Sequence, residues 1–242
     1  MQSNVIENSS GEKLDVTFHP GDRRDYLIVL GHGVTGNKDR PLLMALSEGL
    51  TARGWPCMRV SFSGNGNSGG RFEDATITKE VGDLQSILAA VPDWVRVVYI
   101  GHSMGSAVGV LTAAIDLRIR ALISLAGMSK PAEFYEREFD SLVPGKDCMW
   151  DEPDCPLSQA FADNMKSIGS VLPAAASVTQ PWLLIHGSAD DLVPVQDGKD
   201  AYSAAVCRKQ WLEIDGAGHS FDEMFYPRII DVIDGWLRAH FG

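Results

Sequence analysis

The sequence predicts an α/β fold with a mostly parallel central sheet, and three observations lead to it. From residue 12 to residue 126, short β-branched and aliphatic runs alternate with longer amphipathic stretches, as in parallel strands joined by helices. The chain has 242 residues, which is enough for one domain to bury one core. Its composition, 45% hydrophobic and 22% charged, is that of a globular protein. We therefore expect a single domain over residues 1–242.

Seven apolar runs are the expected strands, and the amphipathic stretches between them are the expected helices. The strand runs are residues 14–18, 26–30, 57–62, 95–100, 121–125, 182–185 and 211–214. Apolar side chains recur at helical spacing at Leu42, Leu43, Leu46 and Leu50, at Val81, Leu84, Ile87, Leu88 and Val91, and at Ile229, Ile230, Ile233, Trp236 and Leu237. Each helix therefore has one apolar stripe that can pack on the sheet.

The alternation stops between Met128 and Thr179, where the sequence becomes aromatic, acidic and proline-containing. Nine acidic and four basic residues lie between positions 130 and 166, so this stretch carries an acidic excess of five. We expect residues 128–179 to be an insertion over the edge of the sheet.

The net charge of −11 narrows the expected partners and compartment. A phosphate backbone or an anionic membrane surface repels such a chain, so we expect no nucleic-acid partner.

No apolar run approaches the roughly 20 residues that cross a bilayer, and the first residues contain no basic region followed by an apolar stretch. We expect a cytoplasmic protein with reduced thiols. A disulfide between Cys148 and Cys155 would need an oxidising compartment.

A serine nucleophile is predicted at Ser103. The segment GHSMG (residues 101–105) follows a strand run and precedes an amphipathic helix, which is the G-x-S-x-G pattern in its strand-turn-helix setting. Such a turn strains the backbone, and strand and helix pass so closely that a Cβ at either flanking glycine would collide. The hydroxyl then projects above the sheet at a helix N-terminus, whose amides favour developing negative charge.

A serine hydroxyl needs a base to remove its proton, and the base needs an acid to orient it. Both should follow the serine on loops after later strands, the acid before the histidine. The run 182–185 is followed by HGSADDLVP, where the H-G-x-x-D spacing favours Asp190 and leaves Asp191 as the alternative. We expect His186, at the strand end, to be a buried side chain that supports the acid loop.

His219 is the predicted base because position separates it from the other histidines. It lies in the small-residue loop DGAGHSF, directly after the late strand run 211–214. His19 precedes the first helix, and His240 is at the C-terminal end. We expect His102, the immediate neighbour of Ser103 in the sequence, to face away from the serine hydroxyl that the base must deprotonate.

Two backbone N–H groups should stabilise the oxyanion of the tetrahedral intermediate. One belongs to Met104, the residue after the nucleophile. The other should come from the turn after an early strand, where GHGVTG (residues 31–36) follows the run 26–30. We assign it to the N–H of Val34, with Thr35 as the alternative.

A dinucleotide site is the competing interpretation of GNGNSG (residues 64–69), which matches G-x-G-x-x-G and follows a strand run. That fingerprint should open a helix from the first strand, with an acid at the end of the second. Here residues 70–72 continue a loop, and Asp83 lies within a helical pattern. No phosphate-binding lysine motif or metal-ligand cluster occurs, so we expect no cofactor and no metal.

At these residues the sequence resembles the α/β-hydrolase superfamily, and within it small serine esterases of the cinnamoyl or feruloyl esterase and monoacylglycerol-lipase-like kind. The resemblance covers nearly the whole chain outside the insertion and rests on HGVTGNK, SFSGNGNSGGRFEDAT, GHSMG, HGSADDLVP and GAGHSF. It implies an α/β-hydrolase fold with Ser103, Asp190 and His219 as the catalytic triad and with Val34 and Met104 as oxyanion donors. Two departures occur. The usual G-H-G-x-S turn reads GNGNS at residues 64–68, and a methionine follows the nucleophile where Gln or Gly is frequent.

The same resemblance implies that residues 128–179 form a lid over the serine. Candidates to line an apolar or aromatic acyl pocket are Phe134, Tyr135, Phe139, Met149, Trp150, Phe161 and Met165. Of these we single out Phe134, Phe139 and Trp150 as substrate-binding, although packing of the lid onto the domain explains each residue equally well. The acidity of the lid disfavours strongly anionic substrates, because like charge slows encounter.

The expected activity is hydrolysis of small-molecule carboxylic esters through an acyl-enzyme. The same triad also suits a serine peptidase or amidase, a thioesterase or a C–C hydrolase, and the scaffold can also bind a ligand without catalysis. The oligomeric state is left open by the sequence.

Overall fold

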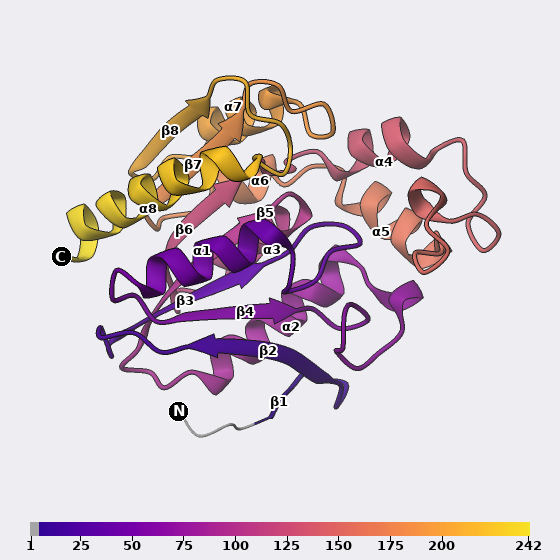
Figure 1. Cartoon of the computed structure of the whole chain (residues 1–242). Helices are drawn as coiled ribbons and strands as arrows, with labels where there is room; N and C mark the ends of the chain where they lie inside the picture. The colour runs from indigo at the N-terminus through magenta and orange to yellow at the C-terminus, as the bar shows by residue number, and fades with distance from the viewer. Residues whose placement is uncertain (1–4) are drawn as a thin grey trace.

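An eight-stranded sheet organises the computed structural model, which describes residues 5–242 (Figure 1). The strands are β1 (Ile6–Glu7), β2 (Lys13–His19), β3 (Tyr26–Gly31), β4 (Cys57–Ser61), β5 (Arg96–His102), β6 (Ile119–Leu125), β7 (Trp182–Gly187) and β8 (Lys209–Ile214). Their order is β1-β2-β4-β3-β5-β6-β7-β8. β1 pairs antiparallel with β2, and β2 pairs antiparallel with β4. The other five neighbouring pairs, from β4-β3 to β7-β8 in this order, are parallel. The predicted α/β class is confirmed, and β1 is the strand that the sequence analysis does not predict.

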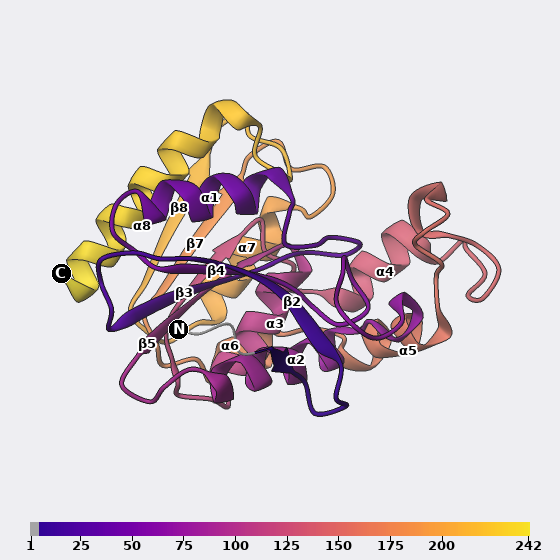
Figure 2. The same cartoon turned by 60° about the horizontal axis from the view of Figure 1, so that its bottom comes forward.

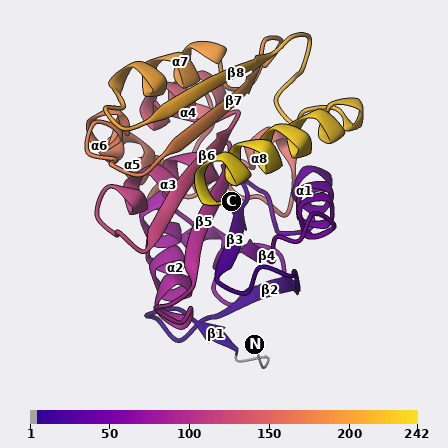
Figure 3. The same ribbon diagram turned by 90° about the vertical axis from the view of Figure 1, so that its left-hand side faces the viewer.

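Helices cover both faces of the sheet (Figure 3). α1 (Pro41–Thr51) and α8 (Tyr226–Phe241) pack together on one face, whereas α2 (Ile77–Ala90), α3 (Met104–Ala113) and α7 (Val195–Ala204) cover the other. Neighbouring residues of β3 alternate between the two cores: Leu27 and Val29 face the α2 and α3 side, and Ile28 and Leu30 face the α1 and α8 side. Burial on both faces explains why the strand runs are continuously apolar.

The chain between β6 and β7, residues 128–179, contains α4 (Pro131–Phe139), α5 (Gln159–Ile168) and α6 (Leu172–Ala175). We call it the β6–β7 segment. Its helices α4 and α5 project beyond the carboxyl edge of the sheet (Figures 1 and 2). Val171, directly before α6, returns to the start of the segment, where its N–H donates to the Ser129 carbonyl oxygen at 2.9 Å. α5 rests on α2 through Asn164, whose side-chain amide donates to Thr78 Oγ1 at 2.7 Å.

The glycine-rich segment after β4 is a loop, as expected. Gly64 and Gly66 have φ of 81° and 56°, values that favour glycine. A short 3₁₀ turn, Phe72–Asp74, follows before α2 begins at Ile77. No helix therefore opens from this loop within residues 5–242, and the geometry of a dinucleotide fingerprint is not formed.

All four cysteines, including Cys148 and Cys155, are free thiols. Within residues 5–242, none of the helices combines the length and the apolar character needed to cross a membrane.

Candidate active site

The carboxyl ends of the parallel strands meet at one edge of the sheet, and four loops gather there. They follow β3, β5, β7 and β8 and contain the predicted oxyanion, nucleophile, acid and base residues. Residues that lie far apart in the sequence are thus presented to one place.

Ser103 occupies the sharp turn between β5 and α3, with φ of 55° and ψ of −121°. A positive φ is strained for a residue with a Cβ, so the surroundings must hold it. The Ser103 N–H donates to the Leu125 carbonyl at 3.0 Å, and its own carbonyl accepts from Met128 N–H at 3.2 Å. A Cβ on Gly101 would lie 2.3 Å from the Gly105 carbonyl oxygen. The flanking glycine is therefore required by close approach, as predicted.

The structure places Asp190 beside His219. His219 Nδ1 lies 2.9 Å from Asp190 Oδ2 and 3.1 Å from Oδ1. The Asp190 side chain is fully buried, and its Oδ1 also accepts from the N–H groups of Val193 at 2.8 Å and Leu192 at 3.1 Å. Asp191, the alternative left open by the sequence, is exposed. Backbone N–H groups therefore hold the Asp190 carboxylate in the position from which it contacts His219.

His186 supports the acid from behind. Its Nε2 lies 2.9 Å from the Val193 carbonyl oxygen and 3.2 Å from Asp190 Oδ2, and because both are acceptors Nε2 carries the hydrogen. Burial alone would raise the pKa of the Asp190 carboxyl, but the hydrogen bonds from His186 and His219 hold that pKa well below its usual range. Asp190 is therefore a carboxylate at neutral pH.

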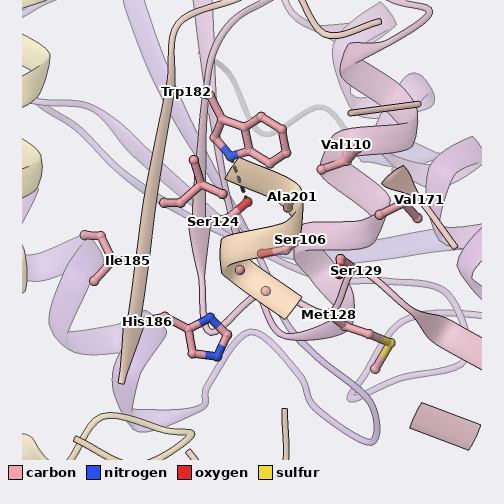
Figure 4. A pocket seen from close by; sticks show the side chains of 13 residues that line it. Ser106, Val110, Ser124, Met128, Ser129, Val171, Trp182, Ile185, His186 and Ala201 are labelled. Atoms are coloured by element: carbon pink, nitrogen blue, oxygen red, sulfur yellow. Dashed lines mark hydrogen bonds between the residues drawn. The ribbon is translucent and has the colours of Figure 1, made fainter. Parts of the chain in front are cut away.

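A water-sized cavity of about 10 Å³ lies behind His186 (Figure 4). His186 is at one end of it and Trp182 is at the other, where the indole N–H donates to Ser124 Oγ at 3.0 Å. Ser129 Oγ, which also borders this cavity, has no hydrogen-bond partner among residues 5–242. The space can hold one water molecule near the supporting histidine.

The His102 side chain contacts the backbone of His219. The sequence does not indicate this contact. His102 Nε2 lies 3.0 Å from the His219 carbonyl oxygen. Burial, aided by the neighbouring His219, lowers the pKa of His102 to about 3, so the ring is neutral and Nε2 donates. His102 therefore ties the turn that holds Ser103 to the loop that carries His219.

A cavity of about 320 Å³ opens at this edge, and both Ser103 and His219 line it. Within residues 5–242 the Ser103 hydroxyl makes no hydrogen bond. Contacts of this kind are often long in unliganded hydrolases and tighten when substrate binds. Phe134 and Trp150 also line the cavity, whereas Phe139 is fully buried behind them, with its ring centroid 4.9 Å from that of Trp150.

The loop after β3 runs directly against Ser103. A Cβ on Gly33 would lie 2.8 Å from Ser103 Cβ, and Val34 lines the cavity. His32 holds this loop, because its Nε2 accepts from the Phe62 N–H at 3.0 Å and its Nδ1 donates to the Gly33 carbonyl at 2.9 Å. Burial lowers the pKa of His32 to about 4, which keeps Nε2 free to accept.

Met104 is the first residue of α3, where amides lack an intrahelical partner. Its side chain is buried against a second water-sized cavity, shared with Val34. The two amides assigned to the oxyanion thus belong to backbone segments that meet at Ser103.

Arg40 also lines the cavity that contains Ser103 and His219, and it is not among the predicted site residues. The sequence contains a signal for it, because Arg40 lies directly before helix α1. The N-terminal end of a helix favours acidic residues, so an arginine there is unusual. Residues 5–242 contain no group of three or more His, Cys, Asp or Glu side chains able to hold a metal ion.

The family model described as alpha/beta hydrolase family matches residues 28–226. An uncharacterized protein of Mycobacterium tuberculosis is 26% identical over 239 residues, which cover 96% of this chain and 78% of the relative. The human mitochondrial palmitoyl-protein thioesterase ABHD10 is 27% identical over 164 residues, which cover 62% of this chain and 52% of that protein.

Among solved structures, Est1E from Butyrivibrio proteoclasticus with ferulic acid bound superposes with a TM-score of 0.84 at 23% identity, covering 98% of both chains. That likeness shows the fold. Because the family model spans most of the chain, this protein belongs to the α/β hydrolase family.

Proposed function

We propose that the protein is a serine hydrolase that cleaves carboxylic esters of small molecules through an acyl-enzyme on Ser103. The observation that carries the proposal is the convergence on one cavity of a serine in a strained turn and a histidine held by a buried carboxylate. The arrangement has the parts that nucleophilic acyl transfer requires, since the acid already orients the base.

In the proposed reaction His219 Nε2 removes the Ser103 proton as Oγ attacks the ester carbonyl. The N–H groups of Val34 and Met104 stabilise the oxyanion. His219 then protonates the leaving alcohol. Water, activated by the same histidine, hydrolyses the acyl-enzyme and releases the acid. Asp190 stays ionised throughout and stabilises the imidazolium.

In this proposal the β6–β7 segment acts as a lid. Phe134 of α4 and Trp150 contribute to the cavity wall, so they are the residues that would contact an apolar acyl group. Phe139 supports them from behind, and we assign it a packing role. Opening of the segment would admit substrate.

Replacement of the nucleophile tests the proposal. Ser103→Ala is expected to abolish hydrolysis of p-nitrophenyl butyrate and labelling by a fluorophosphonate probe, because it removes the hydroxyl that attacks in the proposed reaction. Ser203→Ala, an exposed serine on α7, is the matched control and should keep both. Substantial turnover by a folded Ser103→Ala protein would refute the assignment. Failure of the wild-type protein to react with the probe would favour a binding protein without catalysis.

A thioester substrate is the second candidate, favoured by the similarity to the human palmitoyl-protein thioesterase. Comparison of kcat/KM for acyl esters, thioesters and anilides with the same acyl group separates these activities. Ester cleavage predicts that the oxygen ester exceeds the anilide by several orders of magnitude, and a clear preference for the thioester would reassign the substrate class.

A further inference from the structure

Arg40 gives the catalytic cavity a fixed positive charge. Among residues 5–242 that line this cavity there is no Asp, Glu or Lys. His32 and His102, which also line it, are neutral because they are buried. In a chain with a net charge of −11, the one permanent charge on the wall of this cavity is therefore positive, and the Asp190 carboxylate lies behind His219, outside the wall.

The Arg40 side chain is available to a ligand. The neighbouring acid, Asp39, is already bound by Lys38 Nζ at 2.7 Å and by Arg59 Nη1 at 2.7 Å. Within residues 5–242, no carboxylate lies within ion-pair distance of Arg40. Its Nη2 donates to the Thr35 carbonyl at 2.9 Å, which anchors the side chain beside the oxyanion loop. Since a guanidinium has five N–H donors, others remain free.

Local helix stability does not account for an arginine at this position. Arg40 is the N-cap residue of α1 and makes no side-chain capping bond there. The positive end of the helix dipole disfavours a cation at this end. A residue that conflicts with its local structure at the wall of a reactive cavity points to a role in binding.

The acidic residues of the β6–β7 segment do not cancel this charge. Glu133 and Asp140 face Lys130 and Lys166 at 3.8 and 3.9 Å, and Glu138 pairs with Arg137 at 3.0 Å. None of them lines the cavity. Their charge acts on approach from solvent, where salt screens it over about 8 Å, whereas Arg40 acts on a molecule that is already inside.

We propose, on the basis of the proposed function, that the substrate is an ester with a carboxylate a few bonds from the scissile carbonyl, and that Arg40 binds this carboxylate while Ser103 attacks. An arginine fork accepts the two oxygens of a carboxylate in a bidentate, charge-assisted pair. Half-esters of dicarboxylic acids and esters of carboxylated alcohols both have this chemistry.

Matched substrates test the inference by differing in charge and little in size. The first pair, with the charge on the acyl side, is monomethyl glutarate and methyl glutaramate. The second, with the charge on the alcohol side, is 3-carboxyphenyl butyrate and 3-carbamoylphenyl butyrate. Wild-type protein is expected to give a higher kcat/KM for the charged member of one pair. Arg40→Gln should lower that charged-to-neutral ratio about tenfold, the typical effect of a lost charge-assisted hydrogen bond.

Two controls keep the interpretation specific. Arg40→Lys, which keeps the charge but not the fork, should retain part of the preference. Arg24→Gln, an exposed arginine in the turn before β3 at the opposite edge of the sheet, should leave the ratio unchanged. An unchanged ratio in Arg40→Gln for both pairs would overturn the inference. So would an equal loss for both members, since Arg40 would then only support the oxyanion loop.

Binding measurements separate this inference from the proposed catalysis. Calorimetry with Ser103→Ala should show tighter binding of monomethyl glutarate or 3-carboxyphenyl butyrate than of its neutral partner, and the added Arg40→Gln change should remove the difference. If Ser103→Ala still hydrolyses esters, the proposed function fails while this binding difference still decides the role of Arg40. Equal binding of charged and neutral ligands by Ser103→Ala would overturn the carboxylate site.

Discussion

Asp190 is held from two sides at the residue scale, because His186 and His219 both contact its Oδ2. The first is buried and the second borders the cavity. A triad described only by serine, histidine and acid would omit the side chain that fixes the carboxylate. His186 is a positioning residue in this arrangement, since it acts through Asp190.

We expect His186→Phe to lower kcat/KM about tenfold, the typical effect of a lost hydrogen bond to a charged group. Loss of this bond frees the Asp190 carboxylate to turn away from His219 Nδ1. His186→Gln, whose side-chain amide can donate the same bond, should therefore keep more activity than His186→Phe. His240→Phe, near the C-terminus, is the control. The measurement is kcat/KM, and equal losses in the Gln and Phe variants would contradict the positioning role.

Glu80 presents the opposite case, a buried carboxyl without a charge partner. Its side chain is 1% exposed, and its Oε2 has no hydrogen-bond partner within residues 5–242. Burial, aided by the negative charge of Asp83, raises its pKa well above the usual value. The folded protein therefore holds a proton on Glu80 that the unfolded chain releases.

Glu80→Gln should stabilise the protein, and more so as the pH rises. A raised folded-state pKa contributes stability below the unfolded value of about 4.5, and that contribution is lost as pH increases towards the folded-state pKa. Glutamine keeps the shape without this dependence. The denaturant midpoint at pH 5 and pH 8 measures the effect, and an equal gain at both values would show that Glu80 is not protonated in the fold.

At the scale of elements, the turn between β5 and α3 depends on close approach to the loop after β3. A Cβ on Gly105 would lie 2.5 Å from the His32 carbonyl oxygen and 2.9 Å from that of Gly31. These backbone atoms belong to the segment that contains the proposed oxyanion amide. Strand, helix and loop therefore form one unit around the nucleophile.

Gly105→Ala is expected to cost several kcal/mol of stability, because an overpacked contact with backbone cannot relax cheaply. Any folded fraction should have reduced activity, since the oxyanion loop must shift. Gly82→Ala is the matched control: Gly82 is in the helix α2 with no atom within 4 Å of an added Cβ, so it should gain about 0.8 kcal/mol from helix propensity. Thermal denaturation and kcat/KM test both variants, and a silent Gly105→Ala would contradict the packing argument.

Most elements and the candidate triad could be predicted because their signals are local. Apolar runs with a period of two or 3.6 mark the strands and helices, and G-x-S-x-G marks the turn. His102 escaped prediction because its partner, the His219 carbonyl, is 117 positions away and belongs to the backbone, which has no sequence signal. Periodicity also could not show that Phe134 faces the cavity while Phe139 packs behind it.

At the scale of the whole molecule, buried ionisable groups make stability depend on pH in opposing directions. His32 and His102 have folded-state pKa values of about 4 and about 3, below the ordinary 6.5. Their contribution is present above pH 6.5 and is lost as pH falls towards those values. The protonated Glu80 acts in the opposite sense above pH 4.5. The buried histidines and Glu80 therefore change the free energy of unfolding in opposite directions over this interval.

The free energy of unfolding is thus expected to rise between pH 4.5 and 6.5. Each buried histidine adds about 1.4 kcal/mol per pH unit, and Glu80 removes a similar amount. Glu80→Gln should make the rise steeper, because only the histidines then act. Chemical denaturation at pH 4.5, 5.5 and 6.5 provides the test, and a flat profile in both proteins would show that the histidines are protonated in the fold.

The contact between Ser129 and Val171 of the β6–β7 segment has an evolutionary consequence. The Ser129 carbonyl accepts from Val171, and the Ser129 N–H donates to Asp197 Oδ2 at 2.9 Å, so the chain leaves and re-enters the α/β body at one anchored point. An insertion attached in this way can lengthen, shorten or be exchanged as a cassette without changing the path of the chain through the sheet. In the proposed function, substrate range can therefore change by grafting at one junction, while the strands and the loops that hold Ser103, Asp190 and His219 keep their structure.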